Sequence, residues 1–185
     1  SSNIRCFSDK MYIQNGIQIV DDLSHCDILL GIKEVPKELL LPSKIYFYFS
    51  HTIKKQSYNR LLLSKMLDLN IQMVDYEVLK NDRNKRLLGF GRYAGIVGAY
   101  NGLLTYGLKS QKFNLKPAYL CDNRREVEAE LFKIKLHKEK ILLTGNGRVA
   151  NGALEILSLA NIKEVTINDY LNKNFNEAVF CRLDT

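Results

Sequence analysis

The sequence lacks the features that mark membrane, secreted and metal-binding proteins. None of its apolar runs approaches the roughly 20 residues needed to cross a bilayer, and residues 1–9 hold neither a basic stretch nor the apolar core of a secretory signal. Its four cysteines (Cys6, Cys26, Cys121 and Cys181) form no C-x-x-C pair, and no histidine stands at zinc-ligand spacing from them. We therefore expect reduced thiols in a cytoplasmic protein with no membrane association and no metal.

The sequence also lacks low-complexity regions, internal repeats and a concentrated block of one charge. With 46% hydrophobic and 25% charged residues among 185, its composition excludes disorder. The net charge is +7, but glutamates interrupt the densest basic stretch, residues 124–140, a pattern typical of a solvated helix face. We expect the excess charge to attract anionic small molecules rather than nucleic acid.

Strand and helix patterns alternate in the first half of the chain. Residues 26–32 and 44–50 are short apolar runs bounded by turn formers, which predicts two buried strands. Apolar residues then recur at helical spacing over residues 54–70, and residues 71–77 predict a third strand. This order is typical of an α/β fold with a mostly parallel, Rossmann-like sheet.

Five glycines lie within the apolar residues 91–107. Each interior glycine weakens a helix by roughly 1 kcal/mol relative to alanine, so a loop is one interpretation. The alternative, which we favour, is a helix whose small residues allow another backbone or a ligand to approach closely. Residues 113–120 then connect two lobes, which predicts a substrate domain over residues 1–112 and the start of a nucleotide-binding domain over residues 113–185.

A glycine motif follows the apolar run at residues 141–144. Gly145, Gly147 and Ala150 match G-x-G-x-x-G/A between this predicted strand and a predicted helix over residues 148–159, which is the context of a dinucleotide-binding turn. The helix N-terminus offers free N–H groups to phosphates.

An acidic residue is expected about 20 positions beyond this motif, at the end of the next strand, to accept hydrogen bonds from a ribose. Asp169 is the candidate, at the end of a strand predicted over residues 162–169. A carboxylate there favours NAD over NADP, because it would repel a 2′-phosphate.

Four ionisable residues follow the three predicted strands of the first half. Lys33 and Glu34 come after the first strand, His51 comes after the second, and Glu77 ends the third. Carboxyl ends of parallel strands meet at one sheet edge, where ligands bind. Neighbouring charges and partial burial at that edge suit acid–base chemistry on a polar substrate.

The order and spacing of these segments resemble the NAD-dependent, lysine-forming saccharopine dehydrogenases, within the superfamily of alanine dehydrogenase and the N-terminal part of nicotinamide nucleotide transhydrogenase. The segments that carry the resemblance are DILLGIKEVP (27–36), YFSHTIKKQ (48–56), DYE (75–77), FGRYAG (90–95) and the glycine motif at Gly145. Members of that family are about twice as long, so the resemblance implies a fragment that begins after the first strand of the substrate domain.

The resemblance implies a role for each of ten residues and an NAD-linked reaction that converts saccharopine, NAD and water into lysine, 2-oxoglutarate and NADH. Lys33 and His51 would be the acid–base pair. The substrate-binding residues would be Glu34, Lys54, Gln56 and Glu77, and the dinucleotide-binding residues would be Gly145, Gly147, Arg148 and Ala150.

Other interpretations stay open at this stage. The same acid–base pair fits an alanine dehydrogenase-like oxidative deamination, and a noncatalytic dinucleotide-binding fragment fits the glycine motif. NADP stays open as the cofactor beside NAD, and a homo-oligomer stays open as the form of the protein.

Overall fold

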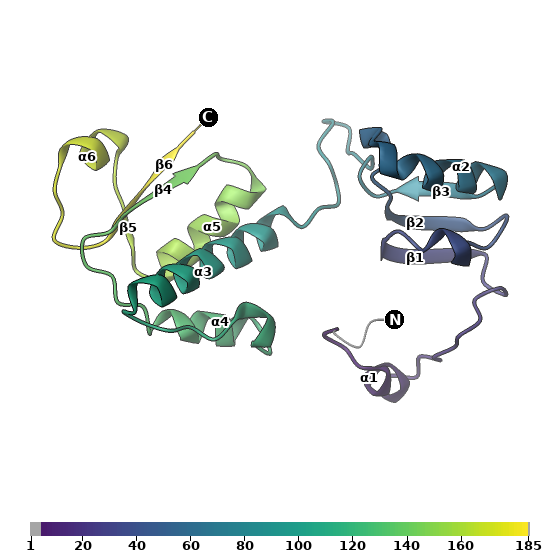
Figure 1. Ribbon diagram of the computed structural model, residues 1–185, viewed down its shortest axis with the longest axis horizontal. Coiled ribbons are helices and arrows are strands. Elements are labelled where there is room, and N and C mark those ends of the chain that lie inside the picture. The colour runs from purple at the N-terminus through teal and green to yellow at the C-terminus, as the bar shows by residue number, and fades with distance from the viewer. Residues whose placement is uncertain (1–4, 185) are drawn as a thin grey trace. The chain divides into compact units, whose positions relative to one another are not determined.

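The structure, a computed structural model, describes residues 5–184, whose strands form two parallel sheets (Figure 1). The first sheet has the order β1 (Ile28–Lys33), β2 (Ile45–Phe49), β3 (Gln72–Asp75), and the second has the order β4 (Lys140–Thr144), β6 (Val179–Leu183), β5 (Lys163–Glu164). Each sheet belongs to its own compact unit, Ser1–Gly89 and Phe90–Thr185. The predicted α/β class with parallel strands is confirmed.

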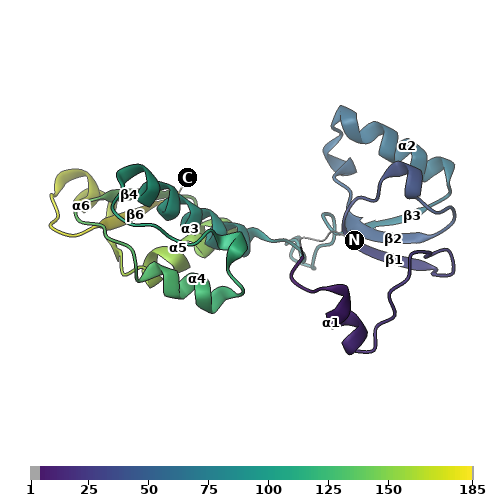
Figure 2. The same ribbon diagram turned by 60° about the horizontal axis from the view of Figure 1, so that its bottom comes forward.

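In the first unit, helix α2 (Arg60–Asp68) covers one face of the sheet (Figure 2). Leu62 and Met66 of α2 are buried against Tyr46 and Tyr48 of β2, together with Leu40. The helix is shorter than the predicted 54–70, because two 3₁₀ turns, Thr52–Lys54 and Ser57–Asn59, precede it. The short helix α1 (Asp9–Gln14) buries none of its residues.

Strand β1 forms as predicted but is not buried. Ile28, Leu30 and Ile32 alternate along it and are 52, 74 and 61% exposed. β1 is an edge strand of the described sheet, and α2 packs on the face opposite these three side chains. The apolar run therefore contributes side chains to a sheet face that no described element covers.

In the second unit, helix α3 (Gly91–Ser110) packs along α5 (Arg148–Leu159), as Figure 1 shows. Their shared core includes Tyr100, Ile156 and Phe180, each at most 1% exposed. Helix α4 (Arg124–Leu131) contributes Leu131 to this core, and α6 (Ile167–Asn172) packs beside β6.

Two glycines set the distance between α3 and α5. A Cβ added at Gly95 would lie 1.9 Å from the Val149 carbonyl oxygen, and one at Gly152 would lie 1.9 Å from the Arg92 carbonyl oxygen. The backbones of the two helices are therefore in direct contact, which confirms the predicted helix with its small-residue face and excludes the loop. Because α3 packs on α5, the compact units divide before residue 90 and not at the expected boundary between residues 112 and 113.

The second sheet departs from the predicted strand over residues 162–169. Strand β5 ends at Glu164, and α6 begins at Ile167, capped by the Thr166 side chain, which accepts from Asp169 N. Strand β6 lies between β4 and β5, whereas in the Rossmann order the second strand lies beside the first. The Thr166 cap favours a helical turn over continuation of the strand.

The glycine contact predicts opposite effects for two alanine substitutions in α3. Gly95→Ala should lower the free energy of unfolding by roughly 1–3 kcal/mol or more, because its Cβ must displace the α5 backbone. Gly98→Ala, with nothing within 4 Å of its Cβ, should raise the free energy by about 0.5–1 kcal/mol through helix propensity alone. Urea denaturation of the two variants measures both effects, and equal midpoints would contradict the close helix contact.

Candidate functional site

The carboxyl ends of β1, β2 and β3 bring three of the four predicted ionisable residues together. A register shift near the end of β1 places Lys33 opposite Phe49, and His51 and Glu77 each lie two residues beyond a strand. Lys33 Nζ is 3.4 Å from His51 Nε2, and His51 Nδ1 is 3.0 Å from Glu77 Oε2. The three side chains form one continuous chain of hydrogen bonds.

The hydrogen-bond partners indicate which ring nitrogen of His51 donates and which accepts. An ionised carboxylate only accepts, so His51 Nδ1 donates to Glu77, and Nε2 keeps the lone pair that accepts from Lys33 Nζ. Burial raises the pKa of Glu77, but hydrogen bonds from His51 and Lys54 outweigh it and hold that pKa below its ordinary value. Lys54 Nζ lies 3.3 Å from Glu77 Oε1. The site therefore holds an anion between cationic and hydrogen-donating groups.

The backbone at His51 is strained and is held in place by its neighbours. Its φ of 57° lies in the left-handed region, which costs a non-glycine residue on the order of 1–3 kcal/mol. Asn59 Nδ2 and Lys54 N both donate to the His51 carbonyl oxygen, at 3.3 and 3.1 Å. The imidazole stacks on the Phe49 ring with centroids 6.5 Å apart. Strain of this kind gathers at functional sites.

Two of the predicted substrate residues stand apart from this cluster. Glu34 lies next to Lys33 in the chain and is exposed, and the described contacts do not join it to His51 or Glu77. Gln56 Oε1 accepts a hydrogen bond from Tyr58 Oη at 2.5 Å. The cluster therefore unites Lys33, His51, Lys54 and Glu77.

The structure adds three residues that the sequence analysis missed. Arg86 Nη1 lies 3.9 Å from Glu77 Oε1, because the bridge between Lys80 and Arg86 folds this basic segment back on itself. No sequence pattern marked Arg86 among its basic neighbours. The other two, Ser50 and Asp75, are buried polar residues. Each stands at the end of an apolar run, and a polar residue in that position is a pattern that the sequence already contains.

The glycine turn in the second unit has the geometry that its motif predicts. Gly145 has a φ of +90°, and Gly147 is the N-cap of α5 without a side-chain cap. Nothing lies within 4 Å of a Cβ added at either glycine. Arg148 begins the helix, and Ala150 is buried. Because the space at both glycines is open, an anion such as a pyrophosphate can approach the helix N-terminus.

Asp169 does not lie where its predicted role requires. It is in the first turn of α6 instead of at a strand end, and it pairs with Lys173 at 2.8 Å. The carboxylate beside the glycine turn is Asp184, just beyond β6, which accepts a hydrogen bond from Asn146 Nδ2 at 2.6 Å. The pairing of β6 with β4 accounts for this exchange.

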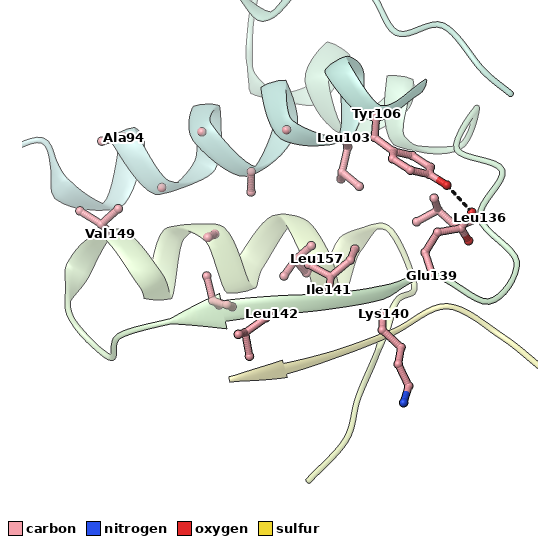
Figure 3. A pocket seen from close by; sticks show the side chains of 16 residues that line it. Ala94, Leu103, Tyr106, Leu136, Glu139, Lys140, Ile141, Leu142, Val149 and Leu157 are labelled. Atoms are coloured by element: carbon pink, nitrogen blue, oxygen red, sulfur yellow. Dashed lines mark hydrogen bonds between the residues drawn. The ribbon is translucent and has the colours of Figure 1, made fainter. Parts of the chain in front are cut away.

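A cavity of about 590 Å³ lies between α3, β4 and α5 (Figure 3). Apolar side chains such as Leu103 and Ile141 line most of it, and Tyr106 donates a hydrogen bond to Glu139 at one end. Lys112 also pairs with that carboxylate, at 2.5 Å, and Lys140 Nζ donates to the Tyr170 carbonyl oxygen. The ionisable groups of the cavity are thus paired with other side chains or with the backbone.

Within residues 5–184, no group of three or more histidine, cysteine or acidic residues is placed to hold a metal ion. No helix in this same part of the chain is long and apolar enough to span a bilayer.

The parallel sheets place the chain in the α/β class, and the carboxyl ends of strands are where proteins of that class bind ligands. The family model for the alanine dehydrogenase/PNT N-terminal domain matches residues 1–97. The chain belongs to this family. The fold of an L-alanine dehydrogenase is similar, with a TM-score of 0.58 and 14% identity, over 96% of this chain and 49% of that one.

Curated relatives extend the similarity to the second unit. The alpha-aminoadipic semialdehyde synthase of Arabidopsis thaliana is 34% identical over 84% of this chain and 16% of that protein. The mitochondrial synthase of Bos taurus is 31% identical over 93% and 21%. The saccharopine dehydrogenase (NAD(+), L-lysine-forming) of Yarrowia lipolytica is 27% identical over 90% and 49%. The chain thus spans less than half the length of each, and the resemblance seen in the sequence is confirmed.

The lowered pKa of Glu77 predicts a pH-dependent contribution to stability. A carboxyl group whose folded pKa is depressed stabilises the fold above its unfolded pKa, and this stabilisation is lost as pH falls through the folded pKa. The difference in free energy of unfolding between wild type and Glu77→Gln should therefore shrink from about pH 6 to about pH 3.

Urea denaturation at several pH values measures this difference. Glu38→Gln, which removes an exposed carboxylate from the same unit, is the matched control. A wild-type advantage over Glu77→Gln that stays constant across the pH range would contradict the assignment.

Proposed function

We propose that the protein is an NAD-dependent oxidoreductase of the saccharopine dehydrogenase type, acting on the carbon–nitrogen bond of an amino acid. The hydrogen-bonded chain of Lys33, His51 and Glu77 carries this proposal. It places two bases, Lys33 and His51, at one sheet edge, and only His51 is hydrogen-bonded to the carboxylate of Glu77. The names of the relatives support the substrate class.

The proposed reaction oxidises the secondary amine of saccharopine and then hydrolyses the product. When bound, NAD would supply the acceptor for the hydride that leaves the carbon next to the nitrogen. Lys33 takes the proton from that nitrogen, which leaves a neutral imine. His51 takes a proton from the attacking water through Nε2 while Lys33 returns its proton to the imine nitrogen, which gives the neutral carbinolamine. As the carbinolamine breaks, His51 gives its proton to that nitrogen and Lys33 takes the hydroxyl proton, so lysine and 2-oxoglutarate leave and Lys33 then releases one proton to solvent. Glu77 stabilises the imidazolium that forms in between.

Cationic groups around Glu77 suit a substrate with several carboxylates. Lys54 and Arg86 both lie within 4 Å of Glu77 Oε1, with side chains 47 and 39% exposed. Their free N–H groups can pair with substrate carboxylates from the solvent side. Glu34 and Gln56 are proposed to contact the amino group and polar atoms farther along the substrate, as the family resemblance implies.

For the cofactor, the open turn at Gly145 and Gly147 and the uncapped N-terminus of α5 fit a pyrophosphate. Arg148 adds a positive charge to the first turn, and Ala150 allows close packing of the helix. The strand-end argument for Asp169 no longer applies, so NAD is proposed on the relative's name and NADP is an outcome of the binding test.

A second candidate is an alanine dehydrogenase-like deamination. The family match and the fold shared with an L-alanine dehydrogenase favour it. Lys33 and His51 would serve the same acid–base roles on a smaller substrate.

The function is tested by NADH oxidation, followed by absorbance, in the longest natural form of this chain. Lysine with 2-oxoglutarate is compared with pyruvate and ammonia. Turnover with only the first pair supports the saccharopine reaction, and turnover with only the second supports the alanine reaction. Turnover with neither pair would contradict both.

Lys33→Met and His51→Gln should each lower kcat by roughly 10²-fold or more with little change in NADH affinity, because each removes a proton acceptor. Lys65→Met, an exposed lysine on α2, is the matched control and should leave kcat unchanged. An unchanged kcat in Lys33→Met would show that the acid–base assignment is wrong.

Gly147→Val should abolish NADH binding while the second unit stays folded, with a loss of about 1 kcal/mol at the N-cap of α5. The added side chain fills open space above the N-terminus of α5 and touches no neighbour within 4 Å at its Cβ. Fluorescence titration with NADH measures binding, and thermal unfolding measures stability. Gly98→Ala, which also adds a Cβ in open space, should bind as the wild type does. Retained affinity in Gly147→Val would refute the assignment of this turn.

A further inference from the structure

A buried hydrogen bond joins the two turns that carry His51 and Glu77. Ser50 Oγ donates to Asp75 Oδ2 at 2.6 Å, and the two residues are only 0 and 8% exposed. Ser50 directly precedes His51, and Asp75 ends β3 two residues before Glu77. The bond therefore spans strands β2 and β3 at the sheet edge that holds the site.

The direction of each hydrogen bond in this network follows from its donors. A carboxylate only accepts, so the single Ser50 hydroxyl proton goes to Asp75. Ser50 Oγ then accepts from Thr52 N at 3.2 Å and from Thr52 Oγ1 at 2.8 Å. The second oxygen of Asp75 accepts from Glu77 N at 2.8 Å.

One carboxylate thus fixes both partners of the imidazole contact. Through Ser50 and Thr52 it holds the turn in which His51 takes its left-handed backbone, and through Glu77 N it fixes the residue that accepts the hydrogen bond from His51 Nδ1. We propose that Asp75 is a positioning residue that, through Ser50 and Glu77, selects the Nδ1–H tautomer of His51 and so leaves Nε2 free to accept from Lys33. Its catalytic importance rests on the proposed function, but the tautomer itself does not.

Packing alone gives no reason for a carboxylate at this position. A buried anion is expensive to desolvate, and apolar side chains of similar volume fill such a space at no such cost. Apolar side chains, however, cannot accept hydrogen bonds, whereas the two carboxylate oxygens of Asp75 accept from two different turns. The geometry therefore points to a directional role for Asp75.

Two substitutions at Asp75 separate positioning from simple loss of a buried group. Asp75→Ala removes both acceptors. Asp75→Asn keeps the link with reversed polarity, because the amide oxygen can accept from Glu77 N while the amide N–H donates to Ser50 Oγ. Leu62→Ala is the control, since it opens the core of the same unit without touching the network.

The readout is the pair of imidazole ¹⁵N chemical shifts of His51 in the present chain above neutral pH, assigned by comparison with His51→Gln. We expect the ratio of Nδ1–H to Nε2–H tautomer to fall roughly tenfold in Asp75→Ala. A change of that size corresponds to the loss of one charge-assisted hydrogen bond. It should stay near the wild-type value in Asp75→Asn and Leu62→Ala.

An unchanged ratio in folded Asp75→Ala would overturn the proposal, and so would an equal fall in Leu62→Ala. If Asp75→Ala does not fold, Ser50→Ala takes its place under the same criterion, because it breaks the link from the β2 side. In the longest natural form, Asp75→Ala should lower kcat with KM unchanged. Absence of wild-type turnover would refute the proposed function and leave the tautomer result standing.

Discussion

Lys33, His51 and Glu77 come from three successive strands, and their side chains meet because those strands are paired in parallel. Parallel pairing brings all three carboxyl ends to one edge, and the register fixes which residues face one another there. A one-residue register shift near the end of β1 places Lys33 opposite Phe49, and the Ser50–Asp75 hydrogen bond links the ends of β2 and β3 at this edge. A slip of one residue in β2 or β3 would separate the imidazole from its carboxylate.

The two units solve their packing problems by different means. In the first unit, α2 buries large side chains against the β2 tyrosines, and the polar edge remains open at the strand ends. In the second unit, backbone meets backbone at Gly95 and Gly152, so the helices approach more closely than any side chain would allow. Because of that contact, α3 belongs to the second unit. The contact also holds α5 in position, and the glycine turn lies at the N-terminus of α5.

Local signals explain which expectations held. The strand, glycine turn and helix around Gly147 were predicted within one residue, because turn geometry and helix capping act over a few positions. The gathering of Lys33 and His51 followed from the rule for parallel strands. The predicted strand that ended at Asp169 was wrong, because the choice between a longer β5 and a new helix depended on the Thr166 cap and on the pairing of β6.

Residue types, apolar periods and turn formers determined the α/β class, the glycine turn and the residues that can exchange protons, because these properties are local to the chain. The tertiary structure alone decided that Arg86 reaches Glu77, that Asp75 links two turns and that β6 lies beside β4. The first depends on the bridge that turns the chain back between Lys80 and Arg86, and the other two depend on the pairing of strands far apart in sequence, which packing and register set.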